Sequence, residues 1–477
     1  MDAAPATRSS RRLASGSRVL GVTSDDDVVY VAQDADASGQ TVFAIAAGGG
    51  QPVVLSTAVN EGAIAVAGAT AVWLELTSSP CVADGLAMAI KSWSRARGTQ
   101  VIASSALLYS AQSFGVTGQF ASTGGALGPF AIALNADNSR VAYTEACSDA
   151  GTTLVLAATD GISPPLTASL PLNAGGATMT VSVTTVGVVR YGSGIPLEML
   201  AGSPLAVTLP SPANVTTDPT GAWAWEPDSD GGTALVRTSD GSAVFNDPKA
   251  APPINHSGIY DISGPEVFDA TGANMFYLSS AGVNELALAS PTAARTLAGT
   301  SGLCASLLQA APDGTSVLCE ANGNTLGYYV ITTGATPAIV SIPDPSAPML
   351  PVSAYGPTGA APFFLGDSTL VWSSGDSLFA EHAFLGTVAT LATSSAVHFA
   401  IGGSQIGADG PTGLEIMDVT GSAPPFVPSP PPESISTLTG VLPGCVPGGA
   451  EVSLCWPAQG GLVAYAAGGS IYSVQTW

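Results

Sequence analysis

Short apolar runs recur along the whole chain, and clusters of Gly, Asp, Asn, Ser and Pro separate them. Runs such as TLVLAA and ELALAS are typical of strands, and the clusters between them are typical of turns. The spacing of an amphipathic helix is hardly found. Its best candidate, residues 84–98, reads equally well as a strand followed by a basic turn. The pattern therefore predicts an all-β protein.

The apolar runs belong to a longer internal repeat. Four segments align with one another, and each has an Asp-, Gly- or Asn-rich turn, an apolar strand, a polar loop and a second strand: 135–161, 217–241, 268–291 and 311–334. Looser copies begin at residues 25, 68, 366 and 460. Between Tyr30 and Trp372, equivalent positions recur every ~49 residues on average, close to the ~40–50 residues of one four-stranded propeller blade.

The turn motif Asp-x-x-Gly or Pro-Asp-Gly, with a strand ending in Tyr, Trp or Cys after it, resembles the TolB-type, WD40-like β-propeller repeat. Residues 311–314 (Ala-Pro-Asp-Gly) match best, whereas Asn138 replaces the turn glycine in the first clear copy. The resemblance covers most of residues 19–477 and implies one all-β propeller of four-stranded blades. Because such propellers rarely exceed about eight blades, we predict eight, with seven as the alternative, and interpret the weak copies as insertions or split blades.

The extent of the repeats predicts two parts of the chain: a disordered basic segment, residues 1–18, and a propeller, residues 19–477. Two Pro-rich stretches, near 343–364 and 423–434, are predicted to be insertions that interrupt the repeats.

Charge is scarce and mostly negative. The 477 residues include 12 basic and 35 acidic side chains, for a net charge of −23 and a mean hydropathy of +0.37. Sheets buried on both faces explain the apolar content, and Asp-rich turns place the negative charge on the rims. Only two lysines occur, so a nucleic-acid partner is excluded. A transmembrane segment is not expected either, since no stretch of about 20 residues is mostly apolar.

Six cysteines suggest local disulfides. One pair flanks the turn AAPDG, a second flanks VPGGA, and a third follows strand-like runs of adjacent repeats; the pairs are Cys304–Cys319, Cys445–Cys455 and Cys81–Cys147. Fifteen connectivities are possible, and six unpaired thiols are the alternative. Disulfides predict an oxidising compartment, namely the periplasm, the outer membrane surface as a lipoprotein, or the medium. The basic N-terminus has no apolar leader segment, so we expect the leader to be absent from this sequence, with a cytoplasmic protein as the alternative.

No local motif of a known catalytic type is present. His256 lies in a loop beside Asp261 and is the histidine to test, although a surface or hydrogen-bonding role explains it better. His382 lies in a different local setting, and His398 lies in a strand-like run and is expected to pack at a blade face. We predict no catalytic residues. The alternative is a hydrolase or lyase whose site forms at the axial funnel from several blades, since such a site leaves no local motif.

Two clusters are candidates for binding. Asp34, Asp36 and Ser38 have the alternating oxygen spacing of a structural calcium loop, but Ile45 stands where a complete loop has Glu, and a solvated turn explains the spacing too. No other cofactor is expected. The second cluster, Trp93 with Arg95 and Arg97, is the basic loop outside the N-terminus and is a candidate contact site.

Together these features predict a non-catalytic, exported bacterial propeller. We expect it to be a monomer that binds a protein or small-ligand partner through its rim loops at the cell envelope.

Overall fold

The computed structural model covers residues 1–477 and describes the following ranges: 6–33, 40–57, 64–77, 86–108, 126–127, 133–134, 138–144, 153–169, 180–183, 189–192, 197–199, 206–208, 216–218, 222–228, 232–237, 241–251, 265–269, 271–311, 313–323, 327–342, 363–364, 369–374, 377–382, 388–392, 398–402, 405–410, 413–418, 424–432, 438–440, 444–448, 452–456 and 462–475. These residues form strands and turns, as the alternation of apolar runs and turn clusters predicts. None of them forms a helix long and apolar enough to cross a membrane.

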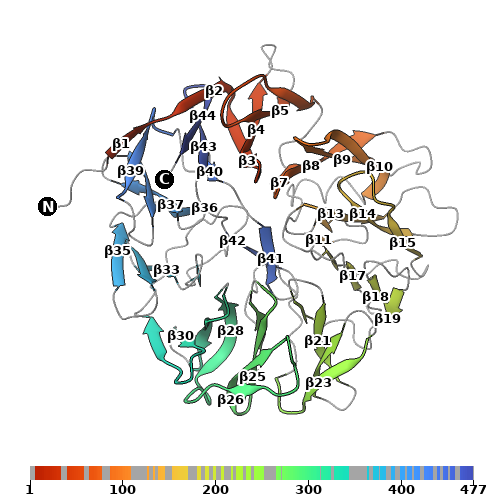
Figure 1. Cartoon of the computed structure of the whole chain (residues 1–477), viewed down its shortest axis with the longest axis vertical. Helices are drawn as coiled ribbons and strands as arrows, with labels where there is room; N and C mark the ends of the chain where they lie inside the picture. The colour runs from red at the N-terminus through yellow and green to blue at the C-terminus, as the bar shows by residue number, and fades with distance from the viewer. Residues whose placement is uncertain are drawn as a thin grey trace.

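The strands assemble into ten sheets of four or five strands, which stand around a common centre as in Figure 1. We number them blades 1 to 10 in ring order. Blade 1 contains β3 (Arg18–Val22), β4 (Asp27–Gln33), β5 (Gln40–Ala46) and β6 (Val53–Ser56). Blade 2 contains β7 (Ile64–Ala67), β8 (Thr70–Thr77), β9 (Leu86–Ser94) and β10 (Gly98–Leu108). Blade 3 contains β12 (Ala133–Leu134), β13 (Arg140–Thr144), β14 (Thr153–Ala158) and β15 (Leu166–Ser169).

Blade 4 takes its first strand from the segment that precedes blade 3. Blade 4 contains β11 (Ala126–Leu127), β16 (Thr180–Val183), β17 (Val189–Gly192), β18 (Leu197–Met199) and β19 (Ala206–Thr208). Blade 5 contains β20 (Thr216–Thr217), β21 (Trp223–Pro227), β22 (Thr233–Arg237) and β23 (Ala243–Asp247). Blade 6 contains β24 (Glu266–Phe268), β25 (Asn274–Ser279), β26 (Gly282–Ala287) and β27 (Arg295–Thr296).

Blades 9 and 10 each take their outermost strand from the N-terminus. Blade 7 contains β28 (Cys304–Ala310), β29 (Ser316–Ala321), β30 (Tyr328–Thr332) and β31 (Ile339–Ile342), and blade 8 contains β32 (Phe363–Phe364), β33 (Thr369–Ser374), β34 (Ser377–His382) and β35 (Val388–Ala392). Blade 9 contains β36 (His398–Gly402), β37 (Gln405–Gly410), β38 (Gly413–Asp418), β39 (Phe426–Ser429) and β1 (Ala6–Ser9). Blade 10 contains β40 (Leu438–Gly440), β43 (Leu462–Ala467), β44 (Ser470–Gln475) and β2 (Arg11–Ser15).

This ring of radial sheets is a β-propeller, as the repeat predicts. The preferred count of eight blades and the alternative of seven are not confirmed, because the described strands form ten four- or five-stranded sheets. The weak copies pair into sheets of their own. Blade 4, for example, is built on strands of only two to four residues, and Tyr191 lies on one of them.

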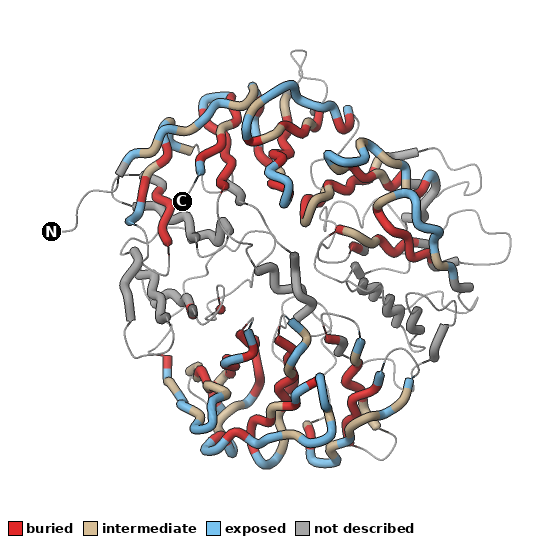
Figure 2. Tube along the Cα trace, viewed as in Figure 1, coloured by how far each residue is buried: buried red, intermediate tan, exposed pale blue. Residues whose placement is uncertain are grey.

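The core lies between neighbouring blades rather than within one central cluster. In the blades whose burial the structure describes, the middle strands are largely buried and exposure increases towards the outer edge (Figure 2). Between blades 10 and 1, for example, Ala464 and Ile471 pack against Val28 and Tyr30. Such burial needs few charged side chains, which accounts for the low charge of the chain.

Residues 6–15 form two strands that close the ring, so the prediction of a disordered segment is wrong for this described part of residues 1–18. Strand β1 pairs in parallel with β39, and β2 pairs antiparallel with β44. Leu13 and Ala14 contribute to the apolar cluster between blades 10 and 1. The prediction considered the charge of the arginines, but strands at the outer edge of a sheet accommodate charge because one side faces solvent.

The two Pro-rich stretches have different outcomes. Residues 343–362 lie outside the described residues, and Phe363–Phe364 form β32. In the second stretch, the prediction of an insertion is wrong for β39, which pairs on one side with β38 and on the other with β1. A proline fits at 428 because β39 pairs with β38 only at Phe426, so Pro428 has no ladder partner on that side.

A separate two-stranded hairpin joins β40 to β43. Its strands, β41 (Gly444–Gly448) and β42 (Val452–Trp456), lie near the centre of the ring in Figure 1. Their register sets Cys445 opposite Cys455, as expected for cysteines that flank a hairpin turn.

Candidate functional site

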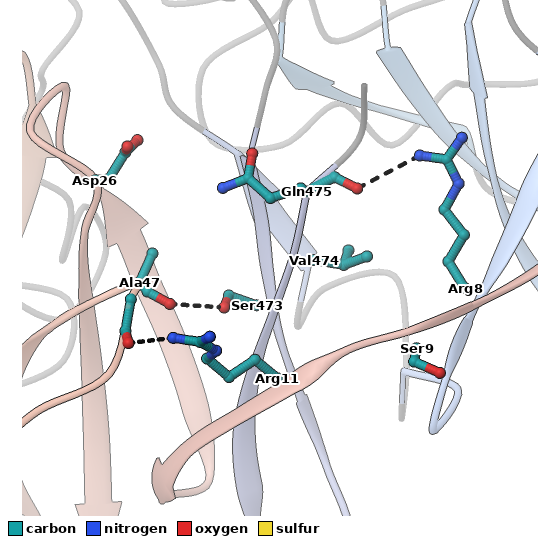
Figure 3. Close-up of a pocket in the computed structure, with 9 residues that line it drawn as sticks. Arg8, Ser9, Arg11, Asp26, Ala47, Ser473, Val474 and Gln475 are labelled. Atoms are coloured by element: carbon teal, nitrogen blue, oxygen red, sulfur yellow. Dashed lines mark hydrogen bonds between the residues drawn. The ribbon is translucent and has the colours of Figure 1, made fainter.

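A pocket of about 690 Å³ lies where the ring closes, between blade 10 and blade 1. We call it the closure pocket. Its walls come from β1, β2, the end of β44 and two turns of blade 1, as Figure 3 shows; the lining residues are Arg8, Ser9, Arg11, Asp26, Ala47, Gly48, Ser473, Val474 and Gln475.

The pocket exists because the third and fourth strands of blade 10 come from opposite ends of the chain. In blades 1 to 8, the outer strands follow one another along the chain, as β9 and β10 do through the turn 95–97, whereas blade 9, like blade 10, takes its outermost strand from the N-terminus. In blade 10 the third strand, β44, ends at Gln475 and the fourth, β2, begins at Arg11. No turn joins these two strands directly, so the space beside their ends stays open.

Two arginines from the closing strands border this space. The Arg8 guanidinium donates to the carbonyl of Gln475 at 3.4 Å and lies 4.4 Å from the centre of the Phe426 ring. The Arg11 guanidinium donates to the carbonyl of Gly48, across the junction in blade 1. Arg11 is exposed. Both bonds are drawn in Figure 3.

The opposite wall is the turn between β3 and β4. Asp26 has a left-handed backbone (φ 59°), a conformation that Asp and Asn tolerate better than most residues. The turn is held by the Thr23 hydroxyl, which accepts from the Asp27 N–H at 3.0 Å, and by the Ala47 N–H, which donates to the Asp26 carbonyl at 2.8 Å. Ser473 donates to the carbonyl of Ala47 at 3.2 Å and ties β44 to the same wall.

The lining includes two arginines and one aspartate, on a protein of net charge −23. Its other side-chain polar groups are two hydroxyls and the Gln475 amide. This arrangement can bind a small anionic group but offers no nucleophile paired with a base.

The basic loop that was predicted to be a binding surface instead joins neighbouring blades to one another. Trp93 is only 5% exposed and packs with Trp73 against Val31 and Leu55 of blade 1. It is therefore not available as a surface contact. Its large apolar ring is better buried between two sheets than exposed to water.

Arg95 and Arg97 join blade 2 to both of its neighbours. Arg95 bonds with both carboxylate oxygens of Asp27 in blade 1, at 2.5–3.1 Å. Arg97 pairs with Asp160 of blade 3 at 3.1 Å. The pKa of Asp160 is lowered to about 2, chiefly because its carboxylate accepts the backbone N–H of Ile162, and further because of bonds from Ser163 and Arg97.

Glu75 forms a second polar link between blades 1 and 2. It accepts from Ser56 of blade 1 at 2.5 Å, from the Trp73 indole at 2.9 Å and from Lys91 at 2.5 Å. Burial raises the pKa of the Glu75 carboxyl, but these three bonds outweigh burial and hold the pKa below its usual range. The Glu75 carboxylate therefore stays charged and links blades 1 and 2 through these hydrogen bonds.

The remaining candidates are only partly covered. Cys304 and Cys319 form a disulfide, as predicted. The calcium candidates Asp34, Asp36 and Ser38 lie outside the described residues, as do Cys81, Cys147 and His256. His382 ends β34 and His398 begins β36, in blades 8 and 9. Among the described residues, no group of three His, Cys, Asp or Glu side chains is placed to hold a metal ion.

Sequence reasoning missed the closure pocket. One signal was present, since Arg8, Arg11, Arg12 and Arg18 make the N-terminus the most basic segment. Interpreted as a tail, it could not be connected to Asp26 or Gly48, whose position beside the N-terminus depends on ring closure.

No protein-family model matches the chain, and no curated protein sequence matches it. Several solved propellers are weakly similar. TolB from Acinetobacter baumannii has 12% identity over 66% of this chain and 81% of its own, with a TM-score of 0.26. BamB from Moraxella catarrhalis has 10% identity over 72% and 92%, with a TM-score of 0.33. The C-terminal WD40 domain of Sif2 has 13% identity over 73% and 99%, with a TM-score of 0.34. Likeness at these scores says nothing about the function of this chain.

Proposed function

We propose that this protein is a non-catalytic β-propeller scaffold that binds a partner protein through its rim, at the envelope of a bacterial cell. The observation that carries the proposal is how the described charged side chains are used. Arg95, Arg97 and Lys91 pair with carboxylates that belong to the blades and their junctions, whereas Arg11 of the closure pocket is exposed and donates to a carbonyl group.

The extracytoplasmic location is supported by the Cys304–Cys319 disulfide, because disulfides persist in oxidising compartments and are rare in the cytosol. Alkylation of intact cells with a thiol-reactive polymer, followed by non-reducing gel electrophoresis, tests this part. We expect no shift of the 304–319 pair without reductant and a shift with it. A fully alkylated pair before reduction would place the protein in a reducing compartment.

Binding is tested with the full chain immobilised and exposed to an envelope extract, with heat-unfolded protein as the control. A candidate identified by mass spectrometry is then purified and titrated by calorimetry. We expect saturable binding at a fixed stoichiometry to the folded chain only. Failure of every purified candidate to bind saturably would contradict the proposed scaffold function.

A further inference from the structure

At the closure pocket, blades meet around an open cavity lined by arginines. Elsewhere, an arginine reaches the turn of the neighbouring blade and is neutralised there or nearby. Arg97 pairs with Asp160, and Arg295 pairs with Glu285 while it also donates to the carbonyls of Thr333 and Gly334. These arginines act as links between turns of adjacent blades.

Arg11 occupies the corresponding place in blade 10, but its bond goes to a carbonyl oxygen of the next blade. A carbonyl group carries no net charge, so the guanidinium keeps its full positive charge. A guanidinium has five N–H donors, and the bond to Gly48 uses one nitrogen, Nη1. The other donors are available to a ligand at this exposed position.

The size and charge of the pocket indicate the ligand. About 690 Å³ is within the usual range for a small ligand or a few residues of a peptide. Arginine binds carboxylates and phosphates through two parallel hydrogen bonds. Asp26 in the wall and its exposed neighbour Asp25 repel a dianion more strongly than they repel a single carboxylate, so the ligand that fits beside Arg11 is a carboxylate.

The walls also suit an extended peptide. Ser9, Ser473 and Gln475 provide hydroxyl and amide groups that can donate to or accept from a peptide backbone. We propose that the closure pocket binds a carboxylate group carried by an extended segment of the partner protein, with Arg11 as its donor. This inference rests on the proposed scaffold function and gives that function a site and a ligand class.

The test uses the full chain and three fluorescent eight-residue Gly-Ser peptides. The first has one central Asp with both termini blocked, the second has Asn in its place, and the third has Asn and a free C-terminal carboxylate. We expect the Asp peptide to bind about tenfold or more tightly than the blocked Asn peptide, since a charge-assisted bond is lost. The third peptide separates a side-chain source of the carboxylate from a terminal one.

Two arginine variants locate the binding. In Arg11→Gln the preference for Asp over Asn should fall to within about twofold, because the charge-assisted bond is absent. Arg12→Gln is the matched control: it is the next residue on β2, donates to Ser15 and does not line the pocket. Its peptide affinity should stay within about twofold of the parent value. Circular dichroism and melting temperature confirm that both variants are folded.

The outcomes separate this proposal from the scaffold function. Equal binding of the Asp and blocked Asn peptides up to millimolar concentration, together with binding of the free-carboxylate peptide no tighter than theirs, would overturn the proposal. So would an unchanged Asp preference in Arg11→Gln. If a purified partner then still binds saturably to Arg11→Gln, the scaffold function stands and the site lies elsewhere. If no purified partner binds but the chain still binds the Asp peptide more tightly than the Asn peptide, the carboxylate site is supported and the scaffold function is contradicted.

Discussion

Turn residues at equivalent positions of several blades adopt a left-handed backbone: Asp26 (φ 59°), Asn138 (57°), Gly272 (69°) and Gly314 (69°). Two of them are shown to reach the preceding blade. The Asn138 amide donates to the carbonyls of Ala65 and Thr70, so the residue that breaks the sequence motif adds bonds between blades. The motif therefore specifies a backbone conformation, which Gly, Asn and Asp all tolerate.

Gly314 is the position where this conformation leaves no room for a side chain. A Cβ there would lie 2.5 Å from the Asn274 amide nitrogen and 2.6 Å from an Asp269 carboxylate oxygen. Asp269 is fully buried and already accepts bonds from Thr271, Ala273 and Asn274. We expect Gly314→Ala to lower the free energy of unfolding by about 2–4 kcal/mol, from backbone strain plus overpacking.

Gly241→Ala is the control for Gly314→Ala. Its φ of 68° is nearly the same, but nothing lies within 4 Å of its added Cβ. We expect a loss of about 1 kcal/mol, from backbone strain alone. Urea denaturation measures both losses. Equal losses in the two variants would show that the close approach between blades 6 and 7 does not exist in solution.

At the scale of single elements, the hairpin turn of blade 2 links three blades through Arg95 and Arg97. The pKa of Asp160, the partner of Arg97, lies at about 2 in the folded protein and near its usual ~3.9 in the unfolded chain. A carboxyl with a depressed folded pKa contributes stability above its unfolded pKa and loses it as the pH falls through the folded pKa.

We therefore expect the wild-type protein to lose part of its stability between about pH 4 and pH 2. Asp160→Asn should lose less over the same interval and should be less stable at pH 7. Thermal melts across this range measure both effects. A parallel pH dependence of the two proteins would show that the Asp160 contacts do not form.

The disulfide of blade 7 joins two neighbouring strands, β28 and β29, over a separation of 15 residues. The chain-entropy model gives about 3 kcal/mol for a loop of this length. The double variant Cys304→Ala/Cys319→Ala should lose about that much stability, and reductant should lower the wild-type stability by a similar amount without affecting the variant. Denaturation of both proteins with and without reductant tests this. No effect of reductant on the wild type would show that the disulfide does not stabilise the fold.

At the scale of the whole molecule, stability depends on closing the ring. Strands β1 and β2 join blades 9 and 10 from the other end of the chain. The Tyr465 hydroxyl of blade 10 donates to the Pro430 carbonyl and accepts from the Ser10 hydroxyl. Burial raises the pKa of the Tyr465 hydroxyl to about 12, so it remains protonated at neutral pH.

Removal of residues 1–15 takes both closing strands away and exposes the edges of β39 and β44. We expect a lower melting temperature and self-association through the open sheet edges, because unpaired edges pair with other chains. Removal of residues 1–5, which leaves both strands in place, is the control. Calorimetry and sedimentation measure the two effects. A shortened protein that melts like the control and stays monomeric would mean that the ring closes without these strands.

Local patterning was sufficient to predict the strands, the turns and the Cys304–Cys319 pair, because each depends on residues within about one blade. It was not sufficient for the blade count, because weak copies with strands of only three or four residues, such as β17 and β18, pair into a sheet of their own. The basic loop was misread for a similar reason, since the partners of Arg95 and Arg97 are 68 and 63 residues away in the sequence.

The sequence by itself determined an all-β chain of repeated small sheets with acidic turns, since alternation and turn chemistry are local properties. Only the tertiary structure decided that the basic N-terminus is part of the ring and that a cationic pocket lies at the closure. The physical reason is distance along the chain: Ser473 bonds to Ala47 across 426 residues. Packing of the blades, rather than any local motif, brings such residues together.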